Sequence, residues 1–371
     1  MSDLTVSKSF LMALLNEGVR QGKKSITIYS PLLDVDLVGV DLEKPSIEWF
    51  AERARYDRAF SEVETKLGDP LLIKDVPTYN DFKEVVEDSL LVTPENMTEL
   101  TDNIRQIEKQ RRGSARYPKQ TLLAIDTNIA YRRLLSRLLM TSEGCGLPDF
   151  DPSDVALVIE NLVQMEISER VNRKYREQDL DAFRKAYENP KLLMTMSNGA
   201  VKESRKALNA QAELTTLRSR YAVWEVAGAA WDADKEKRDN EMIRSLAKHS
   251  MQERVDVLFL TADDKATATA MANRLPSISL RYSRELPSIV PFDPWLFVEL
   301  LHDLAVVYSV VGIRGLGVRV HGDWGGKTAD DYRAERVRLA FEESSTIGQE
   351  LARQWRVVER VQAEIGARSV T

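Results

Sequence analysis

The sequence predicts an α/β protein whose central domain has three layers, with a parallel β-sheet between two layers of helices. Two observations lead to this prediction. Between residues 121 and 285, short apolar runs of about six residues alternate with longer helical stretches. These runs are apolar along their whole length, as strands are when helices cover both faces of a parallel sheet.

Four apolar runs provide the strands expected in this domain. They are TLLAID at 121–126, VALVIE at 155–160, VDVLFL at 255–260 and SISLRY at 277–282. Helices are expected between them, at 131–140, from Asn161 onward, at 238–250 and at 265–275. Strands that alternate with helices in this way are typical of βαβ units, which build parallel sheets.

The two ends of the chain carry no motif that we can assign to a chemical function. Residues 1–104 are expected to form an α+β region, with strands at 25–30 and 35–42. Residues 286–371 are expected to form a C-terminal extension that is mostly helical. Both regions are expected to flank the central domain.

Composition restricts the classes of protein to which the chain can belong. Cys145 is the only cysteine among 371 residues, which excludes an internal disulfide framework and a multi-cysteine zinc site. No run of 18 or more apolar residues is present, so no membrane span is expected, and the first residues do not resemble a signal peptide. We therefore expect a cytoplasmic protein, with association between copies of the chain left open.

A basic run precedes the central domain, although the chain as a whole has a net charge of −6. Residues 105–120 contain six Lys or Arg residues and one acid. A second charged stretch, at about 172–235, lies within the domain at 121–285 and is expected to be a helical insertion. Affinity for phosphate comes from clustered cations, so the distribution of charge matters more than its sum. The basic run is either a solvated linker or an arm that binds a nucleic acid.

Acidic residues follow two of the predicted strands. Asp126 closes the run TLLAID and begins an Asp-Thr-Asn tripeptide, and Asp263 and Asp264 follow VDVLFL. Open parallel sheets place their sites at the carboxyl ends of the strands. Several carboxylates gathered there repel one another unless a cation is present, so this arrangement favours a metal site.

Two further acids are expected to face the same region from helices. Glu166 lies at the edge of an apolar stripe in the helix that begins at Asn161, and Asp239 extends the apolar face of the helix at 238–250. Each acid also has a purely structural interpretation. Asp239 or Asp264 can cap a helix, and Asp126 can form an Asx turn.

The four segments that carry these acids resemble the motifs of the PIN family of metal-dependent nucleases. The matching segments are LLAIDTNIAYRRLL at 122–135, VIENLVQMEISERV at 158–171, RDNEMIRSLAKHS at 238–250 and LFLTADDKATATA at 258–270. The resemblance covers roughly residues 121–285. The choice of the third acid is the least settled, because Asp232 and Asp234 lie close to Asp239 in the sequence.

The resemblance implies a nuclease site with a role for each of these side chains. Asp126, Glu166, Asp239, Asp263 and Asp264 would be catalytic, and all but Asp264 would bind Mg²⁺ or Mn²⁺, since oxygen ligands suit these ions. The supporting residues would be Thr127, Asn128 and Thr261. The residues that would hold the nucleic acid are Arg111, Arg112, Arg116, Lys119, Arg132 and Arg133.

The expected activity is hydrolysis of phosphodiester bonds, most simply by an endoribonuclease that acts on single-stranded RNA. A structure-specific DNA nuclease uses the same kind of acidic cluster, so it is an alternative. A catalytically silent RNA-binding scaffold is another. The segment Gly325–Gly326–Lys327–Thr328 ends like a phosphate-binding loop, but His321 stands where that loop requires its first glycine.

Overall fold

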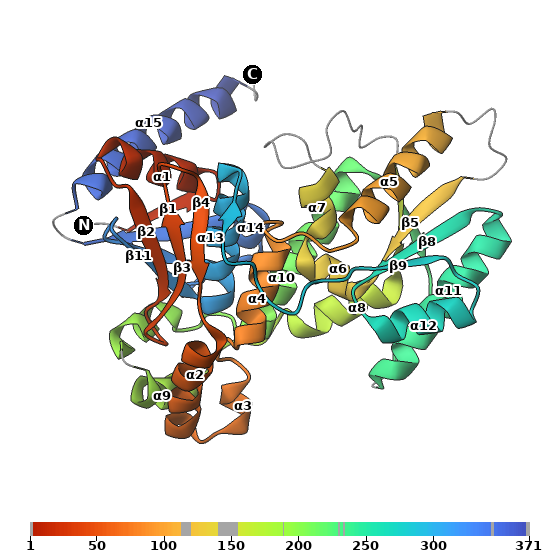
Figure 1. The fold of residues 1–371 in the computed structure, drawn as a ribbon, viewed down its shortest axis with the longest axis horizontal. Coiled ribbons are helices and arrows are strands. Elements are labelled where there is room, and N and C mark those ends of the chain that lie inside the picture. Colours follow the sequence, from red (N-terminus) through yellow and green to blue (C-terminus); the bar gives the residue numbers. More distant parts are fainter. Residues whose placement is uncertain are drawn as a thin grey trace. The chain divides into compact units, whose positions relative to one another are not determined.

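The computed structural model divides the chain into two compact units, each built from segments that are far apart in the sequence (Figure 1). The first unit contains Met1–Val85, Lys174–Lys202 and Pro287–Thr371, and the second contains Val86–Arg173 and Glu203–Leu286. The structure describes residues 3–112, 120–139, 155–187, 189–228, 231–232, 234–342 and 345–368. In these residues, no helix is long and apolar enough to cross a membrane.

The second unit contains a parallel sheet of five strands in the order β7-β6-β5-β8-β9. The strands are β5 (Thr121–Ile125), β6 (Ala156–Glu160), β7 (Ala222–Val226), β8 (Asp256–Thr261) and β9 (Ser277–Ser279). After β5 the chain adds β6 and β7 on one side and then returns to add β8 and β9 on the other. The direction of strand addition therefore changes between β5 and β8, where open parallel sheets bind their ligands.

The central strands of this sheet are buried as the sequence predicts. All five residues of β6 and the last four of β5 are inaccessible to solvent. The helices of the unit are α5 (Met97–Arg112), α6 (Thr127–Arg132), α7 (Leu134–Leu139), α8 (Asn161–Arg170), α10 (Lys202–Arg220), α11 (Lys235–Glu253) and α12 (Asp264–Ala272). Of these, α11 packs across β6, β7 and β8. The mixed α/β character and the parallel sheet are thus confirmed.

The charged stretch at 172–235 differs from the expected helical insertion. Its first part, Lys174–Lys202, belongs to the first unit. Its second part forms α10 and the edge strand β7, so it completes the parallel sheet. The many charged residues of α10 make its contribution to the core hard to see in the sequence. Among them, buried apolar residues recur at helical spacing. They are Ala207, Ala210, Leu214 and Leu217.

The first unit contains an antiparallel sheet of eight strands in the order β1-β13-β12-β11-β2-β3-β4-β10. The strands are β1 (Leu4–Ser7), β2 (Ser25–Ser30), β3 (Val35–Asp41), β4 (Ser46–Phe50), β10 (Val290–Pro291), β11 (Val310–Arg314), β12 (Val318–His321) and β13 (Arg336–Phe341). This sheet joins strands from both ends of the chain, since β11 pairs with β2 and β13 pairs with β1.

This sheet corrects the expected organisation of the two ends. Residues 286–371 do not form a separate helical extension, because their strands share one sheet with those of residues 1–104. The helices of the first unit are α1 (Phe10–Arg20), α2 (Arg53–Leu67), α3 (Pro70–Ile73), α9 (Glu177–Ala186), α13 (Pro294–Tyr308), α14 (Ala329–Arg333) and α15 (Thr346–Arg368), with α4 (Tyr79–Asp88) continuing into the second unit and a 3₁₀ helix, η2, at Pro190–Met196. The backbone N–H and C=O groups of a strand form hydrogen bonds with a neighbouring strand, which can be distant in the sequence. A local sequence pattern does not reveal which strand that neighbour is.

Two smaller expectations are also modified. The basic run at 105–120 begins as helix rather than linker, because α5 continues to Arg112 with Ile104 and Ile107 buried, while residues 113–119 and Cys145 lie outside the described residues. In the segment that ends like a phosphate-binding loop, the amino group of Lys327 donates to the carbonyl of Gly322 and lies 3.9 Å from the ring centre of Tyr332. These contacts give that lysine a structural role.

Candidate functional site

The side chain of Asp126 lies at the carboxyl end of the central strand β5. It is 6% exposed and caps the N-terminus of α6, where its Oδ1 accepts a hydrogen bond of 2.6 Å from the backbone N–H of Thr127. An aspartate is well suited to this position because it satisfies a helix N–H that otherwise has no partner. The sequence thus places a carboxylate at the point where the direction of strand addition changes.

Two polar side chains hold the other oxygen of this carboxylate. Asp126 Oδ2 accepts hydrogen bonds from Thr261 Oγ1 and from Asn128 Nδ2, both at 2.6 Å. Asn128 Oδ1 accepts in turn from the N–H of Ala262, and Thr261 Oγ1 accepts from the N–H of Asp263, both at 3.0 Å. The network ties the end of β5 to the turn after β8 and fixes the orientation of the Asp126 carboxyl group.

Glu166 and Asp239 approach Asp126 from helices α8 and α11. The pKa of Asp126 is raised to about 6, mainly by burial. The charges of Asp239 and Glu166 also raise it, whereas the hydrogen bonds from Thr261 and Thr127 lower it. The pKa of Asp239 is also raised, mainly by burial and additionally by Glu166 and Asp263. The four carboxylates are therefore close enough to act on one another electrostatically.

The two aspartates after β8 have different environments. Asp263 caps the N-terminus of α12, and its Oδ1 accepts a hydrogen bond of 2.8 Å from the N–H of Lys265. Asp264 is exposed, and its Oδ1 accepts a hydrogen bond from the hydroxyl of Ser279 at the end of β9. The structure thus groups Asp263 with Asp126, Glu166 and Asp239, and it places Asp264 on the side of β9.

The neighbours of Asp239 also have separate roles. Asp234 is exposed and caps the N-terminus of α11, where its Oδ1 accepts a hydrogen bond from the N–H of Glu236. Asp232 lies before the helix and accepts from the N–H of Asp234. Asp239 follows one turn later, is half-buried, and makes no hydrogen bond or ion pair with any described residue. Asp239 is electrostatically coupled to Glu166 and Asp263.

Two arginines accompany the acids. Arg170 Nη2 lies 3.3 Å from Glu166 Oε1, and Arg238 Nη2 lies 3.6 Å from the same oxygen. The Arg238 guanidinium is buried, stacks over Trp231 at 4.3 Å from the ring centre, and donates to the carbonyl of Asp232. These guanidinium groups offset part of the negative charge of the cluster. The sequence analysis did not single out Arg238, whose position directly before Asp239 on α11 was the available signal.

The residues that were expected to hold a nucleic acid lie in different surroundings. Arg111 is half-buried on α5, the backbone of Arg112 ends that helix, and Arg116 and Lys119 lie outside the described residues. Arg132 pairs with Asp88 at 2.8 Å and stacks on the ring of Tyr282.

Arg133 is 8% exposed, in a left-handed conformation with φ of 53° between α6 and α7. Since Arg133 is buried and Arg132 is largely covered by its ion pair and stacking contact, we no longer assign either residue to binding a nucleic acid backbone.

A metal ion is implied by the acidic cluster, and the donor atoms suit one in kind. They are carboxylate oxygens, which favour Mg²⁺ or Mn²⁺ over softer metals. Within the described ranges, however, no three acidic, histidine or cysteine side chains lie close enough to hold one ion together. Coordination would therefore require side-chain movement, above all of Glu166, which the two guanidinium groups hold.

Glu160 is a buried carboxyl group that the sequence analysis did not identify. It ends β6 and is 0% exposed, and its Oε2 accepts a hydrogen bond of 2.6 Å from the N–H of Leu162. Its Oε1 is buried without a hydrogen-bond partner among the described residues. Burial raises the pKa of Glu160 to about 7, although the Leu162 N–H lowers it. An acid that closes an otherwise apolar strand was the signal, as it was for Asp126.

We expect Glu160→Gln to change the pH dependence of stability. The unfolded state loses the Glu160 proton near pH 4.5, whereas the folded state retains it up to about pH 7. The parent protein should therefore lose stability as the pH rises through this window, and the variant should not, so the free energy of unfolding of the variant minus that of the parent should increase by up to roughly 3 kcal/mol. Urea unfolding at pH 5 and pH 8 measures this difference, with exposed Glu225→Gln as the control. An equal difference at both pH values would contradict the assignment.

Comparisons with known proteins do not assign the chain to a family. No family model matches the sequence. No curated protein matches it. Among solved structures, the chain is similar to a domain of a functionally unknown protein from Methanocaldococcus jannaschii, with 13% sequence identity and a TM-score of 0.28 over 44% of this chain and 94% of that one. At this level of similarity, the comparison carries no argument about function.

Proposed function

We propose that the second unit is a divalent-metal-dependent nuclease that cleaves single-stranded RNA internally. One observation carries this proposal. The carboxylates of Asp126, Glu166, Asp239 and Asp263 gather at the carboxyl end of a parallel sheet, where burial raises the pKa values of Asp126 and Asp239 and neighbouring acids raise them additionally. Such a group of buried acids is costly without a cation, and a bound metal ion together with a phosphate substrate would balance it.

The order of the strands supports the same function. The first and fourth PIN-like motifs begin on β5 and β8. These two strands are hydrogen-bonded neighbours at the point where strand addition changes direction. Glu166 of the second motif and Asp239 of the third reach this point from α8 and α11. A three-layer PIN-like domain is therefore our proposal for the second unit.

The chain's own residues would divide the work as follows. Asp126 and Asp263 would hold the metal ion directly, and Glu166 and Asp239 would complete its surroundings or hold water. When bound, the ion would activate a water molecule and neutralise charge on the phosphate. The hydrogen bonds of Asp126 with Thr261 and Asn128 would keep its carboxyl group in one orientation, as supporting contacts do around metal ligands.

A silent RNA-binding scaffold is the second candidate, and one observation favours it. Arg170 and Arg238 both approach Glu166 Oε1, so cations of the protein already serve one of the four carboxylates. In a protein that has lost catalysis, these arginines would replace the metal ion in balancing the charge. The two candidates predict opposite results for metal binding and for cleavage.

We expect Mn²⁺ to bind the second unit and to stabilise it. A ligand that binds only the folded state increases the free energy of unfolding, by about 2.7 kcal/mol at one hundred times Kd, and so raises Tm. Calorimetry and thermal unfolding with Mn²⁺, with Mg²⁺ and with EDTA measure the effect. Labelled single-stranded RNA, duplex RNA and DNA under the same conditions test cleavage. Metal-independent Tm together with uncut RNA would favour the scaffold, and cleavage restricted to DNA would favour a DNA nuclease.

A further inference from the structure

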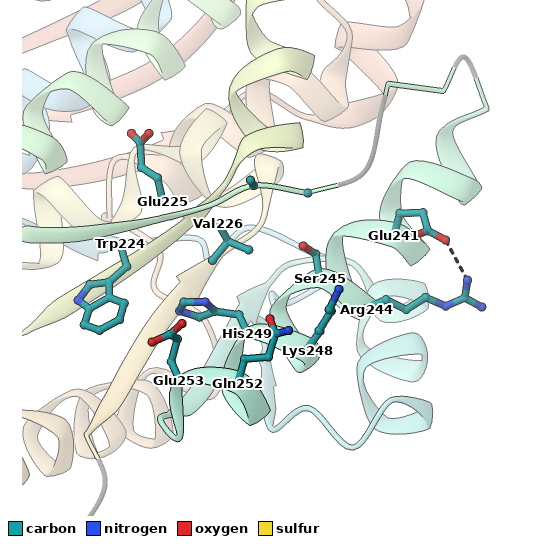
Figure 2. A pocket seen from close by; sticks show the side chains of 12 residues that line it. Trp224, Glu225, Val226, Glu241, Arg244, Ser245, Lys248, His249, Gln252 and Glu253 are labelled. Carbon is teal, nitrogen blue, oxygen red and sulfur yellow. Dashed lines mark hydrogen bonds and ion pairs between the residues drawn. The ribbon is translucent and has the colours of Figure 1, made fainter.

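A pocket of about 690 Å³ lies in the second unit between the edge strand β7 and the helix α11 (Figure 2). One wall is formed by Trp224 to Gly228, and the other by side chains from Glu241 to Glu253. On its outer side, β7 pairs with no further strand among the described residues. A volume of this size lies within the range of pockets that bind small molecules or parts of larger ligands.

Two aromatic rings meet inside this pocket. The indole of Trp224 is 37% exposed, and its centre lies 5.8 Å from the imidazole of His249, at an interplanar angle of 72°. Figure 2 shows His249 pointing from α11 toward Trp224, with Glu253 beside them. The Nε2 atom of His249 is buried without a hydrogen-bond partner among the residues that the structure describes. An exposed indole next to an unsatisfied polar atom favours a ligand that is flat and polar at its edge.

Ion pairs neutralise most of the other charges around the pocket. Glu225 accepts from Arg218 at 3.0 Å, and Arg244 pairs with Glu241 at 2.9 Å. In Figure 2, Arg244 extends toward Glu241, and Glu225 points away from Trp224 on the other side of the strand.

Lys248 and Glu253 have no ion-pair partner in the described part of the chain. Besides the paired charges, one cation, one carboxylate, the amide of Gln252 and the hydroxyl of Ser245 therefore line the pocket together with the aromatic rings. A single cation does not match a site for free phosphate, and this polar rim does not match an apolar ligand.

We infer that this pocket binds one nucleobase of a single-stranded RNA. The base would stack on Trp224, as bases do on aromatic side chains in proteins that bind single strands. The carboxylate of Glu253 and the amide of Gln252 can accept from and donate to the edge of a base, as such groups do in base recognition. Lys248 would contact a neighbouring phosphate. The choice of RNA as the ligand rests on the proposed function.

The pocket is set apart from the acidic cluster along α11. Asp239 and Lys248 are nine residues apart on that helix, which corresponds to roughly 14 Å along its axis. The base in the pocket would therefore belong to a nucleotide that is not itself cleaved. Loss of the pocket should weaken RNA binding and raise KM while kcat changes little.

The test measures binding of a hexameric oligoadenylate and of AMP by calorimetry, in EDTA so that no cleavage occurs. We expect Trp224→Ala to weaken hexamer binding at least tenfold, as loss of one base–aromatic stack does, and Trp224→Phe to retain most of the affinity. Lys248→Gln should weaken binding and reduce its dependence on salt. Met251→Ala changes a 75% exposed apolar residue of the same helix outside the pocket, so it is the matched control.

The results separate this inference from the proposed function. Binding that is unchanged in Trp224→Ala and Lys248→Gln, or that falls equally in Met251→Ala, would overturn the inference even if RNA is cleaved. If the hexamer binds through Trp224 but no RNA is cut with any metal, the inference stands and the nuclease proposal fails. If Trp224→Ala does not fold, the pair Lys248→Gln and Glu253→Gln, both on the exposed side of α11, decides the matter in its place.

Discussion

Asp126→Asn is expected to reduce RNA cleavage by at least a thousandfold, which corresponds to about 4 kcal/mol of transition-state stabilisation. The substitution removes the negative charge of the carboxylate at the centre of the proposed metal site with almost no change in volume. The fold should survive. An amide still accepts from the N–H of Thr127, but the NH₂ group that replaces Oδ2 no longer accepts from Thr261 and Asn128. Burying an amide costs less than burying a carboxylate, which offsets part of this loss. Single-turnover cleavage, circular dichroism and thermal unfolding measure the three effects.

The matched control for this prediction is Asp102→Asn, an exposed aspartate on α5 that should cleave RNA at the parental rate. Mn²⁺ should raise the Tm of this control as it does that of the parent, and it should have little effect on Asp126→Asn. Cleavage within tenfold of the parent in the Asp126 variant would mean that the activity resides elsewhere in the chain. The nuclease site proposed at the carboxyl end of β5 would then be wrong.

Asp239→Asn is expected to reduce cleavage by two orders of magnitude or more, on the order of 3 kcal/mol. Asp239 is half-buried, has a raised pKa and makes no hydrogen bond or ion pair with a described residue. Its substitution therefore removes a charge from the cluster and breaks no structural contact of the described chain. Stability should stay the same or rise, since the cost of burying the charge and the repulsion from Glu166 and Asp263 together outweigh the attraction of Lys235 and Arg238.

The control is the double variant Asp232→Asn with Asp234→Asn. Asp234 caps α11 and Asp232 accepts from its N–H, and asparagine performs both tasks about as well as aspartate. The double variant should cleave RNA within a few-fold of the parent. An inactive double variant beside an active Asp239→Asn would move the third motif to the start of the helix. If both were active, the site would use Asp126, Glu166 and the aspartates after β8 without an acid from α11.

Local patterns were sufficient for the central strands and for the acids at their ends. The runs that became β5, β6 and β8 are mostly apolar and largely buried, as strands are when helices cover both faces of a parallel sheet. A carboxylate that directly follows a buried strand must lie at the edge of the sheet. Asp126 and Asp263 could therefore be placed near one another from the sequence, because their strands are parallel.

Other features depend on pairing and packing between distant segments. The strand β7 (AVWEV) is apolar except for Glu225, but it is a largely exposed edge strand that follows a charged stretch, and the sequence did not lead us to expect a strand there. The sheet of the first unit joins strands near the two ends of the chain, and no local pattern encodes the partner of a strand. Arg132 and Arg133 resemble surface cations in the sequence, but Arg133 is buried and Arg132 is held by Asp88 and Tyr282, residues that are distant from it in the sequence.

The sequence by itself determined the parallel strands β5, β6 and β8 and the positions of Asp126 and Asp263 after two of them, because these properties depend on local hydrophobicity and on position along the chain. The tertiary structure decided how those acids differ. It made Asp263 the cap of α12 and turned Asp264 toward β9, it buried Glu160, and it brought Arg238 against Glu166. It also formed the Trp224 pocket from two segments that are separated in the sequence. The burial of a side chain and the charges around it are defined only when distant segments pack together. These two properties set the pKa and the hydrogen bonds of each side chain.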